Sequence, residues 1–153
     1  MSDIEKSALD LEVYVSAETK LAIPDRVEFK SQATQYLSDG QKTILITRAN
    51  FESIQNRKLL WIEFKDEIKD GTYLIGASDS PFFKIQYTEY SSVSGLTHGI
   101  DYPAISGSVT ATVTKKVNHL SYNFTLDLTV KNKYDEKLTL KGHSNSKVIV
   151  YSL

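Results

Sequence analysis

The stretch from Leu120 to Val130 constrains the fold of this chain more than any other part of its sequence. Six apolar residues occupy successive even positions in it, and polar residues stand between them. A helix would scatter these six side chains around its axis, whereas a strand places all of them on one face. The pattern therefore predicts a long β-strand with one buried face and one wet face.

Shorter alternating sets follow one another along the rest of the chain, with turn residues between them. They begin at Leu11, Val27, Ile44, Leu59, Tyr73, Phe83, Val109, Leu138 and Val148. About nine or ten strands with connections too short for parallel crossovers are typical of an antiparallel all-β fold. We predict a single antiparallel β-sandwich domain that spans residues 1–153. At most one short helix is expected, from Asn50 to Arg57, because Asn50 can cap it and Phe51 and Ile54 lie three residues apart.

The same patterns predict the core and two hairpins. The expected core consists of Tyr122, Phe124, Leu126, Leu128, Phe83, Ile85 and Trp61. A hairpin through Lys116 and His119 would place Thr110, Thr112 and Thr114 on a wet face. We interpret these threonines as ordinary residues of an exposed strand face, because Thr favours strands, rather than as a face that binds ordered ligands. A short connection around Asn145 is interpreted as a second tight hairpin.

Composition makes several classes of function unlikely. The formal net charge of -1 and the pI near 6.3 give no electrostatic bias toward nucleic acid. No stretch approaches the roughly 20 apolar residues needed for a membrane span. The chain has no cysteine, so it has neither disulfides nor a thiolate nucleophile. Because no apolar signal segment is visible, cytoplasmic residence is the default expectation, and export is expected if a native leader precedes this sequence.

The second half of the chain has a recognisable order of turns and strands. A Gly-Thr-Tyr turn and strand at 71–76 is followed by Phe83–Tyr87, a Ser/Gly-rich segment at 106–110 and Tyr122–Leu126. This order resembles small bacterial β-sandwich domains of unknown function that are often found in lipoprotein-like proteins, and it covers about residues 70–151. The resemblance implies the sandwich fold and transfers no catalytic residue. A lipoprotein would need a leader and an acylated cysteine, which this sequence lacks.

The best candidate for a binding site is the segment 88–103, which we expect to be the longest loop. It contains Tyr90, His98, Asp101 and Tyr102. Aromatic side chains that carry hydroxyls can contact a sugar ring or a partner surface. We therefore predict a non-catalytic binding or protein-interaction module that contacts a protein partner or a carbohydrate through this loop. The competing interpretation is an ordered crossover whose tyrosines pack on the rim of the sandwich.

Two alternative functions stay open. In the first, the chain is a small hydrolase in which Ser92 or Ser94 acts with His98 and Asp101. That arrangement lacks the rigid nucleophile elbow and the oxyanion hole that acyl transfer needs. In the second, the strands close into a barrel with an internal cavity that carries an apolar ligand.

No metal, cofactor or catalytic residue is assigned from the sequence. His98, His119 and His143 lie far apart in the chain. The acidic turn at 66–70 lacks the order of oxygen ligands found in calcium loops. Nothing in the pattern indicates an oligomeric state.

Overall fold

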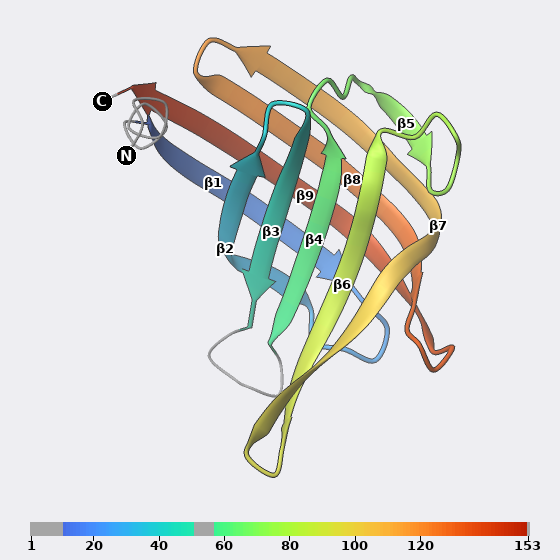
Figure 1. The fold of residues 1–153 in the computed structure, drawn as a ribbon. Helices are drawn as coiled ribbons and strands as arrows, with labels where there is room; N and C mark the ends of the chain where they lie inside the picture. The colour runs from blue at the N-terminus through green and yellow to red at the C-terminus, as the bar shows by residue number, and fades with distance from the viewer. Residues whose placement is uncertain (1–10, 51–56, 153) are drawn as a thin grey trace.

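The computed structural model describes residues 11–50 and 57–152, and these ranges contain nine β-strands and no helix (Figure 1). The strands are β1 (Leu11–Ala22), β2 (Phe29–Ser38), β3 (Lys42–Ala49), β4 (Lys58–Lys65), β5 (Gly71–Leu74), β6 (Phe82–Val93), β7 (Leu96–Lys116), β8 (His119–Lys131) and β9 (Lys137–Ser152). Every pairing between them is antiparallel. The all-β prediction and the expected number of strands are confirmed. The helix expected at 50–57 falls largely on residues outside the described ranges.

The strands close into an eight-stranded barrel, so the prediction of a sandwich is wrong. Around the barrel the order is β7-β6-β4-β3-β2-β1-β9-β8, and pairing of β8 with β7 closes it, while β5 adds a short strand beside β7. Figure 1 shows β2, β3, β4 and β6 crossing in front of β1, β9 and β8. Alternation in the sequence identifies the buried face of each strand but not the neighbours at its edges, and the edges distinguish a barrel from a sandwich.

One strand, β7, closes the barrel by changing partners along its length. Its residues 96–103 pair with β6, and residues 104–116 pair with β8. A register shift between Ala104 and Ser106 marks the change. The next residue, Gly107, has a φ of 110°, and a Cβ there would overlap the carbonyl oxygen of Asp127. Glycine is therefore required where β7 turns onto β8.

The other corner of the barrel lies between β1 and β2. Strand β1 pairs with β9 along its whole length but with β2 only at Lys20 and Leu21. Beyond these two residues β2 reaches β1 through the side chain of Ser31, whose Oγ accepts from the Thr19 amide at 3.0 Å and donates to the Ala17 carbonyl oxygen at 3.5 Å. This corner is a seam in the hydrogen-bonded wall of the barrel.

Inward-facing side chains from all around the barrel fill its interior, and β8 contributes five buried apolar residues to it. The predicted core residues Tyr122, Phe124, Leu126, Leu128 and Ile85 are buried, as expected. The Phe64 ring packs edge-on against the rings of Tyr122 and Phe124, with centroids 5.0 and 5.2 Å away. Aromatic contacts of this kind stabilise a core beyond the area that they bury.

Two predicted core residues lie elsewhere. Phe83 is 54% exposed, because a register shift opposite Glu63 turns Phe82 inward in its place. Phe82 packs on Phe124 with ring centroids 5.5 Å apart. Trp61 is half-buried on the outer face of β4, where its indole Nε1 donates to Glu63 Oε1 at 3.1 Å.

The hairpin between β7 and β8 forms where it was predicted. Thr110 lies opposite Thr125 and Thr112 opposite Asn123 on the exposed face. The hairpin expected around Asn145 is wrong, because β9 continues through it without a turn. The chain turns instead before β9, where the Asn132 side chain accepts hydrogen bonds from the backbone amides of Tyr134 and Glu136.

The corner at Gly107 generates a stability prediction. Gly107→Ala should lower the free energy of unfolding by more than about 4 kcal/mol, because the new methyl group meets backbone that cannot move without opening β7 from β8. Gly76→Ala is the matched control, since Gly76 also has a positive φ but has open space where its Cβ would stand. It should cost only about 1–2 kcal/mol. Urea unfolding measures both, and equal losses would contradict the proposed role of Gly107.

Candidate functional site

The segment predicted to be a long loop is a β-hairpin. Strands β6 and β7 pair from Gln86 to Val93 and from Leu96 to Pro103. Ser94 and Gly95 form the two-residue turn, with φ values of 54° and 80°, which suits the right-handed twist of a hairpin. This hairpin, the β6–β7 arm (residues 86–103), projects beyond the end of the barrel (Figure 1). The loop prediction failed because Ser92 and residues 94–99 are exposed on both faces of the arm, so this part of the sequence shows no apolar alternation.

The structure does not bring the four predicted site residues together. Tyr90 is half-buried and lies opposite Gly99, where a Cβ would be 3.1 Å from its ring. Asp101 is exposed, and its Oδ1 accepts from the Thr88 hydroxyl at 2.8 Å. Tyr102 is buried, while His98 is exposed. Because His98 and Asp101 are three residues apart on one strand, they point to opposite faces and do not form a catalytic pair.

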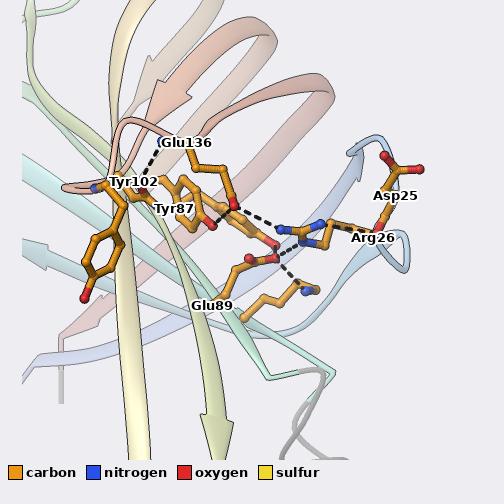
Figure 2. Close-up of polar contacts among 9 residues, drawn as sticks. Asp25, Arg26, Tyr87, Glu89, Tyr102 and Glu136 are labelled. Atoms are coloured by element: carbon orange, nitrogen blue, oxygen red, sulfur yellow. Dashed lines mark hydrogen bonds and ion pairs between the residues drawn. The ribbon is translucent and has the colours of Figure 1, made fainter.

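A charged cluster, the Glu89 cluster, lies at the end of the barrel from which the arm projects, and sequence reasoning missed it (Figure 2). Glu89 Oε2 accepts three hydrogen bonds, from Arg26 Nε at 2.7 Å, from Tyr87 Oη at 2.7 Å and from Lys58 Nζ at 3.2 Å. The side chain of Lys58 is only 5% exposed and that of Glu89 16%. Buried charges of this kind are tolerated because each is paired and hydrogen-bonded.

The Glu89 cluster joins two separate connections of the barrel. Arg26 belongs to the connection between β1 and β2, and its Nη2 also lies 3.3 Å from Glu136 Oε1 in the turn before β9. The hydroxyl of Tyr102 donates to the same Glu136 oxygen at 2.5 Å. Two cations thus face two carboxylates, and their charges cancel. The cluster ties these connections to β6 and β7 and closes this end of the barrel.

The pKa values in the cluster favour the charged pairs. Burial by itself raises the pKa of Glu89, but hydrogen bonds from Arg26 and Tyr87 and the charge of Lys58 outweigh burial and lower it from the usual 4.5. The hydrogen bond to Glu89 raises the pKa of Arg26. Burial and the hydrogen bond to Glu136 raise the pKa of Tyr102 to about 12. At neutral pH Glu89 and Arg26 are therefore held charged and Tyr102 is held neutral, which fits a structural role rather than acid–base catalysis.

The cluster generates a pH prediction. Because the folded-state pKa of Glu89 lies below 4.5, its contribution to stability is complete above that pH and is lost as the pH falls toward the folded value. Glu89→Gln should lower the free energy of unfolding at pH 7 by about 3–5 kcal/mol, since it leaves Arg26 and Lys58 without their carboxylate. It should also flatten the dependence of stability on pH below about 4.5. Urea unfolding over a pH series measures both effects.

The exposed Glu67 provides the matched control for this series. Glu67→Gln should keep the acid dependence of the wild type. A Glu89→Gln variant with the wild-type dependence would show that Glu89 does not carry it.

A second polar feature lies inside the barrel, in a row that runs across three strands. Ala17 of β1 faces Ser146 of β9, which in turn faces Tyr122 of β8. Ser146 and Tyr122 are both fully buried, and among the described residues neither hydroxyl has a hydrogen-bond partner. Thr43 lies beside the Tyr122 hydroxyl, where it lowers the pKa of Tyr122 against the larger effect of burial, and its own hydroxyl donates to Asp66. Unpartnered buried hydroxyls are uncommon in folded proteins.

In the neighbouring row, Thr19 and Ser144, the buried hydroxyls do have hydrogen-bond partners. Thr19 and Ser144 are also buried and face each other, and their hydroxyl oxygens are 2.8 Å apart. The two rows differ because Ala17, which occupies the place of Thr19, brings no hydroxyl to Ser146. Sequence reasoning placed Tyr122 in the core but could not identify Ser146, since the register between β8 and β9 is needed to pair them.

The unpartnered hydroxyls lie next to the seam between β1 and β2. Residues of β1 that share the inward face of the buried Leu21 become progressively more exposed toward its start, so that Ala17 and Val15 are half-buried and Val13 is 44% exposed. Tyr36 of β2 and Val150 of β9 are half-buried near this end and pack against the core. Apolar side chains therefore lead from solvent toward Ser146 and Tyr122.

The two rows generate a paired stability prediction. Ser144→Ala should lower the free energy of unfolding by about 1–3 kcal/mol, because it leaves the Thr19 hydroxyl buried without a partner. Ser146→Ala removes a hydroxyl that has no partner, so it should leave stability within about 0.5 kcal/mol of wild type or raise it. Urea unfolding of both variants measures the difference. A loss in Ser146→Ala as large as that in Ser144→Ala would show that Ser146 is satisfied in solution.

Comparisons with known proteins, and searches for metal-binding groups and membrane-spanning helices, add three findings. No protein-family model, curated protein or solved structure matches this chain, so the resemblance to small bacterial β-sandwich domains stays a prediction. Within residues 11–50 and 57–152, no three His, Asp or Glu side chains converge where a metal ion could bind. The same ranges include no helix long and apolar enough to cross a membrane.

Proposed function

We propose that this protein is a non-catalytic carrier that binds a small apolar ligand inside its barrel. The observation that carries the proposal is the row of two unpartnered buried hydroxyls, Ser146 and Tyr122, reached past half-exposed apolar side chains at the seam. An eight-stranded barrel has an interior that is either filled by side chains or able to hold one small ligand. Concave apolar sites with a few convergent polar groups are the usual form of small-molecule sites.

The two ends of the barrel support the same proposal. At the Glu89 cluster the carboxylates and cations are bonded to one another, which favours a structural role for that end of the barrel. At the seam, the register between β1 and β2 is limited to Lys20 and Leu21, so the wall is easier to open there. Entry is therefore expected between β1 and β2. The hydrolase alternative gains no support, since His98 and Asp101 lie on opposite faces of β7.

A second candidate function is contact with a protein partner or a carbohydrate through the β6–β7 arm. A surface groove of about 450 Å³ at the base of the arm is lined in part by Asp101, Ile105 and Lys133. At the tip, Leu96 is 65% exposed. These features suit a contact surface, and Tyr90, His98, Asp101 and Tyr102 remain its predicted residues.

The carrier proposal predicts the effect of filling the seam. A neutral fluorescent probe such as N-phenyl-1-naphthylamine should bind the wild-type protein with enhanced fluorescence and raise its thermal midpoint. At about 100 times its dissociation constant it should add about 2.7 kcal/mol of stability, a shift of roughly 5–10 °C. Ala17→Phe should reduce the affinity at least about tenfold, because its ring would occupy the space beside Ser146. Fluorescence titration measures the change.

Ser16→Phe is the matched control, since Ser16 is exposed on the opposite face of the same strand. It should bind the probe like the wild type. Circular dichroism and thermal midpoints show whether both variants fold. Equal affinities in two folded variants would place the probe outside the barrel and contradict the proposal.

A further inference from the structure

The first part of β7, residues 97–103, has a strand neighbour on only one of its two edges. On that edge it pairs with β6. Strand β8 lies on the opposite edge of β7, but its pairing stops where Val130 faces Ala104. Within the described residues, no strand continues beside residues 97–103. We call this unpaired stretch of backbone the free edge of the arm.

The register of the hairpin determines which backbone groups the free edge presents. The turn at Ser94 and Gly95 directs the N–H of Leu96 to the carbonyl of Val93, and these two residues face each other. In an antiparallel pair the bonded and non-bonded residues alternate. The even-numbered residues of β7 therefore bond to β6. The odd-numbered residues 97, 99, 101 and 103 direct their backbone groups to the free edge.

Two observations support this assignment. Pro103 has no N–H, so a position that makes no bonds to β6 suits it. Tyr90 faces Gly99, and its N–H donates away from β7, to the carbonyl oxygen of Arg57 at 3.0 Å. Tyr90 and Gly99 are therefore a non-bonded pair, as the alternation requires.

The free edge is open to another chain. Thr97, Gly99, Asp101 and Pro103 are exposed, and no backbone group of another described residue bonds to theirs. Three of the four also line the groove of about 450 Å³ at the base of the arm. An added strand lies about 4.7–4.9 Å from its neighbour, so it would occupy this groove. Unpaired edges of this kind are templates for pairing with an extended peptide.

The side chains in the groove favour a partner with apolar and acidic residues. Pro103 and Ile105 line it, and Ile105 is 42% exposed. Lys131 and Lys133, the lysine pair, line the groove where β8 ends. Asp101 is the single carboxylate among the described lining residues, so the groove carries an excess of positive charge. An acidic side chain at this point of the added strand would be attracted to the lysine pair.

The two lysines differ in how far their charges are already paired. Lys131 Nζ lies 3.4 Å from a carboxylate oxygen of Asp135. Lys133 lies over the ring of Tyr134, and no carboxylate among the described residues pairs with it. Lys133 is therefore the better partner for an added acidic residue.

A second copy of the chain matches this edge poorly. If two arms paired edge to edge in antiparallel fashion, the lysine pair of one copy would lie near the tip of the other arm. The tip, residues 94–98, has no acidic residue and contains His98. The charge of the groove thus favours a different chain over self-association.

We infer that the free edge binds an extended segment of a protein partner as an added strand, with acidic residues beside the lysine pair and apolar residues against Pro103 and Ile105. The segment runs antiparallel to β7, because it takes the place that β8 leaves. Its N-terminal end therefore lies at the lysine pair. The inference rests on the second candidate function, contact through the β6–β7 arm, and not on the carrier function.

A synthetic peptide of this chemistry tests the inference with the full chain. The peptide Glu-Glu-Val-Thr-Val-Thr-Val, acetylated and carrying fluorescein at its C-terminal end, should raise its fluorescence anisotropy on binding. The same peptide with Lys in place of both Glu residues should bind at least about tenfold more weakly. Lys133→Glu should weaken binding of the acidic peptide about fivefold. Lys141→Glu is the control, since Lys141 is exposed on β9 and gives the same change in net charge.

A second pair of variants tests the backbone bonds. Thr97→Pro removes an N–H from the free edge without removing a bond to β6, and should weaken peptide binding about fivefold to tenfold. Thr97→Ala keeps this N–H and should bind the peptide like the wild type. Circular dichroism and thermal midpoints show that both variants fold.

Amide hydrogen exchange followed by NMR locates the added strand directly. Bound peptide should slow exchange at the amides of Thr97, Gly99 and Asp101. The amides of residues 98, 100 and 102 already bond to β6, so their exchange should not change. This alternation along one strand is specific to strand addition.

The outcomes separate strand addition from contact through the arm in general. Slower exchange at the three odd-numbered amides, together with weaker binding in Thr97→Pro, supports strand addition. If the peptide binds and changes the arm without this alternation, contact through the arm stands and strand addition is wrong. If the acidic peptide does not bind, or changes only residues outside the arm and the groove, the inference is overturned. None of these results bears on binding of N-phenyl-1-naphthylamine inside the barrel.

Discussion

The pairing of β7 with two different neighbours is the constraint on which the rest of this structure depends. Its first residues pair with β6 and its later ones with β8, so one strand links the two halves of the wall. Without the second pairing the strands would form an open sheet, with unpaired edges on β7 and β8. The change of partner requires a backbone conformation and a close approach that only Gly107 permits. The barrel interior, and any site within it, exists because this corner can form.

Closure of the wall gives the two ends of the barrel different chemistry. At one end, Arg26, Lys58 and Glu89 form a buried charge cluster whose members satisfy one another. Breaking such a cluster is costly, so this end is expected to stay shut. Near the other end the wall has a seam between β1 and β2, and the hydroxyls of Tyr122 and Ser146 lie beside it without partners among the described residues. Within the described residues the barrel is therefore held by buried ion pairs at one end and by limited β1–β2 pairing near the other, and this difference underlies the proposal that a ligand enters from one side.

Local features of this fold could be predicted from the sequence, and long-range ones could not. The alternation from Leu120 to Val130 correctly predicts the inward face of β8, because side-chain direction within a strand depends only on its own residues. The edges of the strands depend on distant residues, so the sandwich was predicted where a barrel forms. The exchange of Phe83 for Phe82 has the same cause, since a bulge is set by the register with β4.

The candidate site illustrates the same division. Lys58 and Glu89 share the inward face of the apolar residues two and four positions away, and a charge at such a position was a signal that could have revealed the cluster. Their partnership with Arg26 required the fold. Tyr122 was predicted in the core, but its unpartnered hydroxyl follows from the serine that β9 happens to place opposite it. The segment 88–103 was mistaken for a loop because the outer part of the arm, Ser92 and residues 94–99, is exposed on both faces and shows no alternation.

The central claim is that a ligand binds inside the barrel beside Tyr122 and Ser146, and the location of a bound probe tests it most directly. Isotope-filtered NOE spectra of the labelled protein with bound N-phenyl-1-naphthylamine report which protein protons lie next to the probe. The account predicts contacts from the probe to the methyl groups of Val15 and Val148 and to the ring of Tyr122. Contacts confined to outer residues such as Ile105 would contradict it.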